Sequence, residues 1–382
     1  MNTTVESSHP SSRITIRDLA KRLDLSHATI SMALRDHPKI AEKTRCRVKE
    51  EAERCGYRPE PMLSALATYR QMKKAPIDHG RLAWLYNNLS RAQMFSTPLF
   101  RRYFEGACSR ANSLGYCVDE FYLDETKMTG SRLSSILQAR GIQGILLPPQ
   151  PRLQLNKRLE MLWDQFSAVT FGFSLFHPQL HMVGSAQYRI GMATTRKLQE
   201  LGYERIGFLE TETFGLRTDN NFLAGFHMAS LSVPTSRRIP PLSIPEALPL
   251  ARISERVRSW ITRWRIDALV CVSGIQHILI EAGCRVPEDC AVALLGWQSE
   301  FPNMAGMDEQ GELIGVAAVN FLVGMIHRGE RGVPESPYRL LIEGKWRDGD
   351  SAPPAAMRKK GATEPTQMQV ATHKSRCTLS AG

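Results

Sequence analysis

The sequence predicts an all-α helix-turn-helix head followed by an α/β domain of two lobes. Residues 14–58 hold two short amphipathic segments, a tight turn and a third amphipathic segment within about 45 residues. From residue 81 to about 350, short apolar runs alternate with helix-length segments, which is typical of parallel sheets with crossover helices. The chain is also basic, with a net charge of +11 and an isoelectric point near 9.4, which suits a polyanionic partner.

The first segment has one apolar face. Ile16, Leu19, Ala20 and Leu23 recur at the i, i+3, i+4 and i+7 spacing of an amphipathic helix. Thr15 stands directly before this run and is expected to be its N-cap. We therefore predict a short helix over two turns.

A second helix follows after a break at residues 24–26. Ser26 is expected to cap it, and Ile30, Ala33 and Leu34 form its buried side. The opposite face, which would meet DNA, carries His27, Ala28, Ser31, Met32 and Arg35.

A third helix is predicted over roughly residues 42–55. Val48, Ala52 and Cys55 share one face, and Gly56 suits the left-handed position after a helix end. Between residues 13 and 58 there are twelve Lys or Arg against seven Asp or Glu. On these features alone an ordinary three-helix bundle remains an alternative to a DNA-binding head.

Fixed positions across this region resemble the DNA-binding head of the LacI (lactose repressor) family of bacterial transcription regulators. The family pattern T-x-x-D-[VL]-A-x-x-x-x-[VL]-S-x-x-T-[VI]-S is matched in register from Thr15 to Ser31, and T-R-x-R-V and G-Y-x-P follow at family spacing. The matching positions are Thr15, Asp18, Leu19, Ala20, Leu25, Ser26, Thr29, Ile30, Ser31, Thr44, Arg45, Arg47, Val48, Gly56, Tyr57 and Pro59.

The resemblance implies a hinge helix after Pro59 whose leucine wedges into the minor groove of the operator. Leu66 matches that leucine by spacing, and an apolar wedge bends DNA by unstacking a base step. A plain linker is the alternative. The DNA-contacting residues that we expect, as base-reading, phosphate-contacting or wedge residues, are Thr15, Ser26, His27, Ala28, Thr29, Ser31, Met32, Arg35, Arg45, Arg47 and Leu66.

The head departs from the family pattern at several positions. Met32 stands where an arginine is common, so the bidentate contact of a guanidinium with guanine is absent and the operator is expected to differ. Glu60, Leu63 and Ser64 replace the customary hinge Asn, Ala and Arg. Ala41 replaces the usual serine cap of the third helix, at a cost of about 1 kcal/mol.

The α/β part contains a repeated feature, a helix that ends in Gly-Tyr and leads into a strand. It occurs at residues 115–116 and again at 202–203, which indicates two similar halves. The predicted elements are strands at 81–86, 116–122, 144–147, 168–171, 206–209, 268–272 and 291–295, and helices near 98–114 and 131–139. The family resemblance implies a periplasmic-binding-protein-like sensor, with a ligand between the lobes and a dimer interface along them.

The sensor lacks polar anchors that sugar-binding relatives keep. Phe222 stands at the position of a common ligand-binding arginine, Gln298 and Ser299 replace an acidic pair, and Ser273 replaces an aspartate. Aromatic stacking and directional hydrogen bonds could still hold a sugar or another flat ligand. The expected ligand-binding residues are Arg217, Asn221, Phe222, Trp297 and Gln298. The alternative is that Phe222 and Trp297 only pack the cleft, in a sensor that no longer binds a small molecule.

Several classes of protein are disfavoured. The eight cysteines form no C-x-x-C pair, and the N-terminus lacks the apolar core of a signal peptide, so we expect reduced thiols in the cytoplasm. Motifs of metalloproteases, P-loop NTPases and dinucleotide enzymes are absent from the sequence, so no metal and no cofactor are expected. No run of about 18 apolar residues is expected, and hence no membrane span.

We divide the chain into a head at 13–58, a hinge helix and linker at 59–78, a two-lobed effector-binding and dimerisation domain at 79–351, and a disordered tail at 352–382. The predicted function is a homodimeric transcriptional repressor that binds a pseudo-palindromic double-stranded DNA operator and responds to a small molecule, with a sugar as first candidate. The alternatives are an exported solute-binding protein, a regulator with a degenerate cleft, and an enzyme acting in the cleft. No nucleophile and base are gathered in the sequence, so we do not expect an enzyme.

Overall fold

The computed structural model describes residues 14–34, 40–57, 80–87, 90–123, 128–150, 159–272 and 274–358; the side chains of Ala28 and Ser31 are not described. Two compact units divide the chain. The first comprises residues 1–186, 217–219 and 310–343, and the second comprises the remainder. Each unit is therefore assembled from separate stretches of sequence, and the chain passes from one to the other several times.

The head is a three-helix bundle. Its helices are α1 (Ile16–Leu23), α2 (His27–Ala33) and α3 (Glu42–Arg54). The core consists of Leu19, Leu23, Ile30, Ala33, Val48 and Ala52, with Ile16, Ala20, Leu34 and Cys55 packed against it. This is the apolar set that the sequence pattern predicts, and α3 ends one residue before the end predicted for the third helix.

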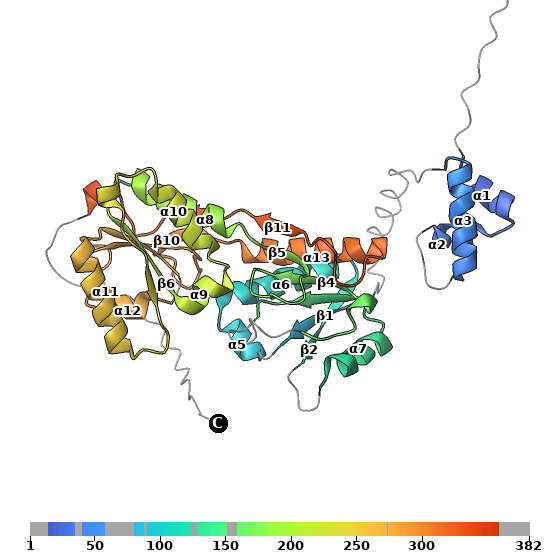
Figure 1. The fold of residues 1–382 in the computed structure, drawn as a ribbon, viewed down its shortest axis with the longest axis horizontal. Helices are drawn as coiled ribbons and strands as arrows, with labels where there is room; N and C mark the ends of the chain where they lie inside the picture. Colours follow the sequence, from blue (N-terminus) through green and yellow to red (C-terminus); the bar gives the residue numbers. More distant parts are fainter. Residues whose placement is uncertain are drawn as a thin grey trace, which may run out of the picture. The chain divides into compact units, whose positions relative to one another are not determined.

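The first unit is built on a six-stranded parallel sheet in the order β11-β5-β4-β3-β1-β2 (Figure 1). Its strands are β1 (Gly80–Tyr86), β2 (Tyr116–Tyr122), β3 (Gly144–Leu147), β4 (Ser167–Phe171), β5 (His181–Ser185) and β11 (Arg339–Ile342). Its helices are α5 (Arg91–Phe95), α6 (Pro98–Ser113), α7 (Gly130–Ala139) and α13 (Gly311–Arg328).

Both faces of this sheet are covered. Side chains of β1 alternate between the two faces. Leu82, Trp84 and Tyr86 pack in one core with residues of α6 and α13. Ala83 and Leu85 pack in a second core with residues of α7. This arrangement explains why the strand is a continuous apolar run. The predicted parallel α/β class is confirmed for this unit.

The second unit has a six-stranded sheet in the order β12-β10-β9-β8-β6-β7, parallel except for the β10–β12 pair. Its strands are β6 (Ile206–Thr211), β7 (Leu242–Ile244), β8 (Ala268–Cys271), β9 (Ala291–Leu294), β10 (Ala305–Asp308) and β12 (Lys345–Arg347). Its helices are α8 (Gln187–Glu200), α9 (Glu212–Arg217), α10 (Asn221–Ser230), α11 (Leu250–Trp264) and α12 (Gln276–Glu281), although Arg217 itself groups with the first unit.

Glycines let one pair of helices approach closely in each unit. In the first unit, a Cβ on Gly315 of α13 would lie 2.2 Å from the carbonyl oxygen of Tyr103 in α6. In the second unit, a Cβ on Gly225 of α10 would lie 2.1 Å from the carbonyl oxygen of Tyr188 in α8. The two halves thus share a packing device as well as the repeated Gly-Tyr feature.

Helix α13 corrects the expectation that the chain has no 18-residue apolar run. Gly311–Arg328 is long and apolar enough to cross a membrane by length and composition, with a mean hydropathy of 1.2. Its inner face, including Ile314, Ala318 and Leu322, lies in the core of the first unit, and α13 packs along α6. The apolar composition is therefore accounted for by burial against the sheet.

The predicted start of the disordered tail, residue 352, also lies too early in the chain. Residues 352–358 are folded onto the second unit rather than disordered. Ala352 is buried, the hydroxyl of Tyr203 donates a 2.5 Å hydrogen bond to the carbonyl oxygen of Pro353, and Arg358 donates one to the carbonyl oxygen of Asp267. The sequence of this stretch is rich in alanine and proline and has no helix or strand periodicity, so only its contacts reveal that it is ordered. The rest of the expected tail, and the expected hinge at 59–78, lie outside the described residues.

Candidate DNA-binding and ligand-binding sites

Side chains at the starts of α1 and α2 cap these helices and stabilise the head. The Thr15 hydroxyl accepts a hydrogen bond from the backbone N–H of Asp18, and the Asp18 carboxylate accepts one from the N–H of Thr15 at 2.9 Å, which completes a capping box. Hydrogen bonds from Thr15 hold the pKa of Asp18 below its usual value. Ser26 Oγ accepts a hydrogen bond from the N–H of Thr29 at 3.1 Å and thereby caps α2.

The turn between α1 and α2 is set by backbone geometry. Asp24 adopts the left-handed conformation, with φ of 50°, at the end of α1. The N–H of Leu25 then bonds to the carbonyl oxygen of Ala20 at 3.1 Å. Ser26 is the N-cap of the next helix, so only three residues, Asp24, Leu25 and Ser26, connect the two helices, as in a helix-turn-helix.

Basic and acidic side chains join α3 to the rest of the head. Arg54 donates hydrogen bonds to Glu51 at 2.8 and 2.9 Å, and Arg22 of α1 lies 3.6 Å from the same carboxylate. The hydrogen bonds from Arg54 are the main cause that lowers the pKa of Glu51 to about 2. This cluster was not predicted from the sequence. It connects α1 to α3 through the contact between Arg22 and Glu51.

The expected DNA-contacting residues have different surroundings. Ser26 and His27 are exposed at the start of α2, whereas Thr29 and Met32 are half-buried. Thr15 and Ser26 use their hydroxyl oxygens as caps. Arg47 donates a hydrogen bond to the carbonyl oxygen of Leu23. Arg35 and Leu66 lie outside the described residues, as do the side chains of Ala28 and Ser31, so their expected contacts stay predictions.

The expected ligand-binding residues do not share one environment. Phe222 is only 1% exposed, lies in the core of the second unit and stacks on Phe214 with ring centroids 5.5 Å apart. The expectation that Phe222 stacks on a ligand is therefore not met in this conformation, because its ring is covered by the protein. Arg217 lies in the first unit, with its guanidinium 5.5 Å from the ring of Phe100. Asn221 and Gln298 are half-buried in the second unit.

Trp297 is held by contacts with Arg347 and with the backbone of β10. Its half-buried ring lies 5.3 Å from the guanidinium of Arg347, and its backbone N–H bonds to the carbonyl oxygen of Met307 at 2.7 Å. Arg347 also forms a 3.2 Å ion pair with Asp308, whose side chain is nearly fully buried at the end of β10. The indole thus contacts a guanidinium, and its buried Nε1 has no hydrogen-bond partner among the described residues.

Polar atoms without a partner among the described residues gather at the carboxyl ends of neighbouring parallel strands in the second unit. They are Oε2 of Glu210 near the end of β6, Nε2 of Gln276 after β8, and Nε1 of Trp297 after β9. The other amide atom of Gln276, Oε1, accepts a hydrogen bond from the N–H of Gly274 at 2.8 Å, which orients the side chain. In open parallel sheets, ligands bind at this edge.

Glu210 was not identified from the sequence, and it is the most perturbed acid of this edge. Its side chain is 3% exposed, and burial raises its pKa to about 7. A Cβ on Gly215 of α9 would lie 3.0 Å from Oε1 of Glu210, so the helix passes close to the carboxyl group because that position is glycine. A buried acid with an unpaired oxygen can bind a hydroxyl or amine donor of a ligand.

The first unit has a polar cluster of its own at the corresponding edge of its sheet. Asn87, after β1, donates a 2.7 Å hydrogen bond to Oε1 of Gln150, which follows β3. The N–H of Gln150 in turn donates to the hydroxyl of Ser174, which follows β4, at 2.7 Å. All three residues are buried. Unlike Trp297 and Glu210, they satisfy one another.

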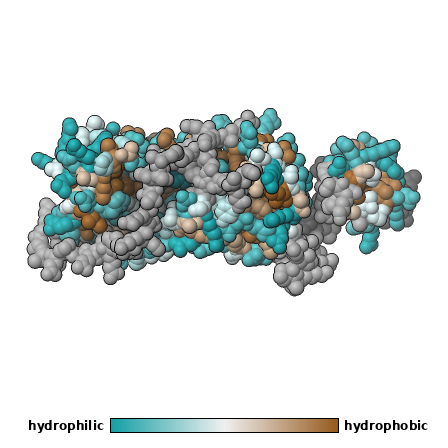
Figure 2. Space-filling view, turned by 90° about the horizontal axis from the view of Figure 1, so that it is seen from below, coloured by the Kyte–Doolittle hydropathy of each residue, from teal (hydrophilic) through white to brown (hydrophobic). Residues whose placement is uncertain are grey.

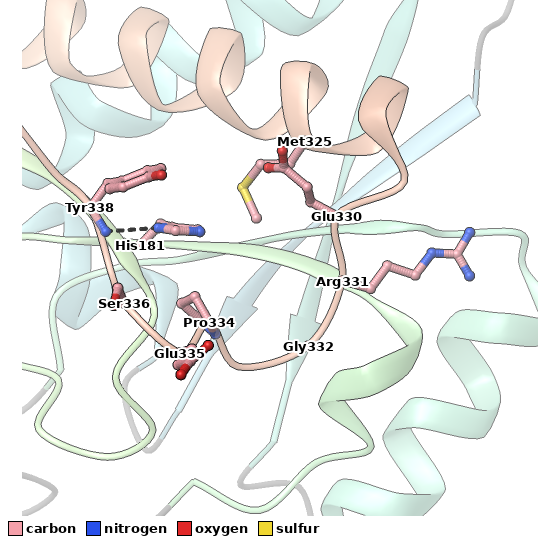
Figure 3. Close-up of a pocket in the computed structure, with 9 residues that line it drawn as sticks. All are labelled: His181, Met325, Glu330, Arg331, Gly332, Pro334, Glu335, Ser336 and Tyr338. Atoms are coloured by element: carbon pink, nitrogen blue, oxygen red, sulfur yellow. Dashed lines mark hydrogen bonds between the residues drawn. The ribbon is translucent and has the colours of Figure 1, made fainter. Parts of the chain in front are cut away.

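A cavity of about 390 Å³ in the first unit lies at the opposite, amino edge of the sheet (Figure 3). His181, at the start of β5, accepts a 2.9 Å hydrogen bond at Nδ1 from the N–H of Tyr338, so the neutral ring carries its proton on Nε2. Burial lowers the pKa of His181, which favours that neutral form. Met325, Pro334 and Tyr338 line the cavity together with charged side chains. None of the expected ligand-binding residues lies there.

Comparisons with known proteins agree with this architecture. Residues 15–60 match the family model described as bacterial regulatory proteins, lacI family. A search of curated proteins finds no match. The structure resembles the transcriptional regulator CelR in complex with cellobiose, with 20% identity and a TM-score of 0.51, covering 89% of this chain and 100% of that one.

Two other solved structures are similar at the level of the fold. One is the lac repressor dimer bound to operator and the anti-inducer ONPF, with 14% identity, a TM-score of 0.51, and coverage of 90% of this chain and 100% of that one. The other is a periplasmic binding protein/LacI transcriptional regulator from Alkaliphilus metalliredigens complexed with D-xylulofuranose, with 15% identity, a TM-score of 0.51, and coverage of 72% and 99%.

The helix-turn-helix head and the two-sheet, periplasmic-binding-protein-like α/β fold define a DNA-binding transcriptional regulator. The head, at residues 15–60, matches the lacI-family model, in agreement with the sequence motifs. The description of that model is bacterial regulatory proteins. The identities of the solved structures are low, so they establish the fold and do not identify the ligand.

Proposed function

We propose that this protein is a cytoplasmic transcriptional repressor that binds a pseudo-palindromic operator as a homodimer and is controlled by a small molecule. The observation that carries the proposal is the capped helix-turn-helix of residues 15–57 within a lacI-family match. Two heads related by a two-fold axis read two half-sites, so a symmetric operator mirrors a symmetric dimer.

On the DNA side, α2 is the helix that enters the major groove. His27, Ala28, Ser31 and Met32 would face base edges. Arg35 and Arg45 would contact phosphates, with Thr15, Ser26, Thr29 and Arg47 in support. With Met32 in place of arginine, an apolar contact such as that with a thymine methyl group replaces a guanine-specific hydrogen bond. Met32→Arg is expected to shift the preferred base at one symmetric position to guanine.

Leu66 is proposed to wedge into the minor groove between the half-sites. Leu66→Ala should reduce affinity for the operator and leave affinity for unrelated DNA nearly unchanged. The matched control is Leu63→Ala, a neighbouring leucine with no assigned wedge role. An equal loss on both DNAs for Leu66→Ala would contradict the wedge.

Homodimer formation is supported by exposed apolar side chains in both units. Leu313 of α13 is 46% exposed in the first unit, and Met228 of α10 and Leu231 are exposed in the second. Apolar residues reach the surface among hydrophilic ones on the face drawn in Figure 2. Light scattering on the full-length protein, as it elutes from a size-exclusion column, should give a molar mass of twice the 43.0 kDa of one chain. A monomer at micromolar concentration, in the presence of operator, would contradict the dimer.

For the effector we propose a ligand with several hydroxyl groups, a sugar being the first candidate, at the carboxyl edge of the second sheet. The unpaired atoms of Glu210, Gln276 and Trp297 support this choice, because a donor, an acceptor and an aromatic face are what a sugar ring needs. A thermal-shift screen of sugars and nucleosides on the full chain tests it, since a bound ligand raises the melting temperature.

A regulator without an effector is the second candidate, favoured by the burial of Phe222 at the position of a common ligand-binding arginine. A compound that stabilises the wild type but not Trp297→Ala would exclude this candidate, provided that Trp264→Ala, a partly buried tryptophan in α11, still responds. No stabilisation by any compound, with the fold intact, would favour it.

The experiment that tests the regulator itself is the selection of random DNA duplexes by the purified full-length chain. The affinity for the selected duplexes is then measured across salt concentrations. A pseudo-palindromic consensus with a steep inverse dependence on salt is expected. Weak binding with no enriched sequence would overturn sequence-specific regulation by this chain alone.

A further inference from the structure

The cavity at the amino edge of the first sheet contains a buried hydrogen-bond donor. His181, at the start of β5, is only 7% exposed, and its Nδ1 accepts the hydrogen bond from the N–H of Tyr338 at 2.9 Å. Its Nε2 points away from that bond and into the cavity (Figure 3), and no described residue forms a hydrogen bond with it. The cavity therefore offers a buried N–H group that an occupant can satisfy.

Hydrogen bonds to the sheet hold the wall of this cavity. Residues 329–338, which join α13 to β11, provide most of its lining. The hydroxyl of Ser167, at the start of β4, donates a 2.5 Å hydrogen bond to the carbonyl oxygen of Glu330. The N–H of Gly332 bonds to the carbonyl oxygen of Phe166 at 3.0 Å. The wall is thus in place before a ligand arrives, which lowers the entropic cost of binding.

The lining includes one acid and one base that pair with nothing else among the described residues. The side chains of Glu335 and Arg331 form no ion pair and no hydrogen bond there. Glu330 differs, because its two carboxylate oxygens accept hydrogen bonds from Arg328 at 2.5 and 2.9 Å. One charge of each sign is therefore left for a ligand.

The rest of the lining is largely apolar or aromatic. Met325 is buried and Pro334 is half-buried, and the ring of Tyr338 stacks on that of His181 with centroids 5.0 Å apart. The volume of about 390 Å³ lies within the range of ordinary small-molecule sites. The cavity thus combines an N–H donor, two opposite charges and an apolar surface.

We propose that this cavity binds an α-amino acid with an apolar side chain. The carboxylate of the ligand accepts the hydrogen bond of His181 Nε2 and is attracted by the guanidinium of Arg331. Its ammonium group pairs with Glu335, and its side chain packs on Met325 and Pro334. A metal ion does not fit at His181, because the nitrogen that faces the cavity carries a proton and has no lone pair to give.

This site is separate from the proposed effector site. Its residues belong to the first unit, whereas Glu210, Gln276 and Trp297 belong to the second. It also lies at the amino edge of its sheet and not at the carboxyl edge. The two proposals can therefore succeed or fail independently.

Isothermal titration calorimetry of the full-length protein with leucine, methionine and phenylalanine tests the proposal. At least one of the three is expected to bind, with one site per chain. For leucine, isocaproate lacks the ammonium group and isoamylamine lacks the carboxylate, and each should bind about tenfold more weakly than the amino acid. The corresponding analogues serve for the other two. No binding of any of the three at millimolar concentration, or equal affinity for both analogues, would overturn the proposal.

Variants locate the bound amino acid. Glu335→Gln should weaken binding about tenfold and Arg331→Gln about threefold, without unfolding the protein, because both side chains are exposed. Glu105→Gln, at an exposed acid of α6 in the same unit, should bind as the wild type does. Trp297→Ala should also bind normally, because it alters only the proposed effector site. Unchanged binding in Glu335→Gln, or binding lost in Trp297→Ala, would show that the amino acid binds elsewhere and would overturn the proposal.

Discussion

Arg47 of α3 donates a 3.1 Å hydrogen bond from Nη2 to the carbonyl oxygen of Leu23, at the end of α1. The last carbonyl groups of a helix lack partners within the helix, and a guanidinium near them is also favoured by the helix dipole. Arg47 therefore has a structural role in the head, which agrees with the supporting role proposed for it on the DNA side.

We predict that Arg47→Ala destabilises the head by about 1 kcal/mol, which is the usual value of such a hydrogen bond. Trypsin cleavage within the head of the full-length protein should then become about fivefold faster, since cleavage reports the opened population. The slope of operator affinity against salt should stay unchanged. A slope reduced by about one, with normal cleavage, would instead mean that Arg47 mainly binds phosphate.

Ala41 offers a chance to stabilise the head. It precedes α3 with φ of −56° and ψ of 141° and makes no side-chain cap. We predict that Ala41→Ser slows cleavage of the head by up to about fivefold, because a serine hydroxyl can accept a hydrogen bond from a free N–H of the first turn, for about 1 kcal/mol. Ser26→Ala, which removes an existing cap, is the opposite control. Equal cleavage rates for all three proteins would show that neither cap matters.

The contact of α13 with α6 should not tolerate a methyl group. Gly315→Ala would place a Cβ 2.2 Å from the Tyr103 carbonyl oxygen, so we predict a loss of about 2–3 kcal/mol and a melting temperature lowered by several degrees. Gly324→Ala, in the same helix, would meet only the guanidinium of the flexible Arg328, at 3.0 Å. We expect it to be neutral or slightly stabilising because alanine favours helix. Similar losses in both variants would contradict the packing argument.

Glu210 should make the stability of the apo protein depend on pH. Its pKa is raised to about 7 in the folded state from a usual 4.5, so the folded chain retains a proton that the unfolded chain loses. Stability therefore falls as pH rises from about 4.5 to 7 and is level above that, a loss of about 2–3 kcal/mol. Glu210→Gln should be more stable than the wild type at pH 8 and equal to it near pH 4.

Urea unfolding of both proteins across this pH range measures the effect. Glu200→Gln, at an exposed position in α8, is the control and should leave the profile unchanged. If a sugar binds Glu210, its addition should shrink the difference between the wild type and Glu210→Gln at pH 8, because the ligand then provides the missing partner. A difference that has the same size at every pH would mean that shape, and not ionisation, decides.

Most of the local structure could be read from the sequence because it depends on neighbours along the chain. The cap at Ser26, the apolar face that contains Leu19 and Leu23, and the glycine at position 56 with φ of +65° follow from helix periodicity and capping. The central strands follow from short apolar runs buried on both faces. These features need no knowledge of the fold.

Three strands, β5, β11 and β12, were not predicted from the sequence because their apolar patterns are weak. β11 and β12 are edge strands with mostly exposed side chains, and each pairs with a strand more than 35 residues earlier in the chain. β5 lies inside its sheet but contains His181, Gly184 and Ser185, which interrupt an apolar pattern. Their positions are decided by sheet partners and not by local periodicity.

The sequence by itself determined the helical head, its family pattern and the parallel α/β class, because capping, periodicity and motif spacing are properties of contiguous residues. Only the tertiary structure decided that Phe222 is a core residue and that Glu210 is a buried acid whose Oε2 has no partner among the described residues. Burial and pKa depend on which distant segments fold against a side chain, and that information is not present in the spacing of residues along the chain.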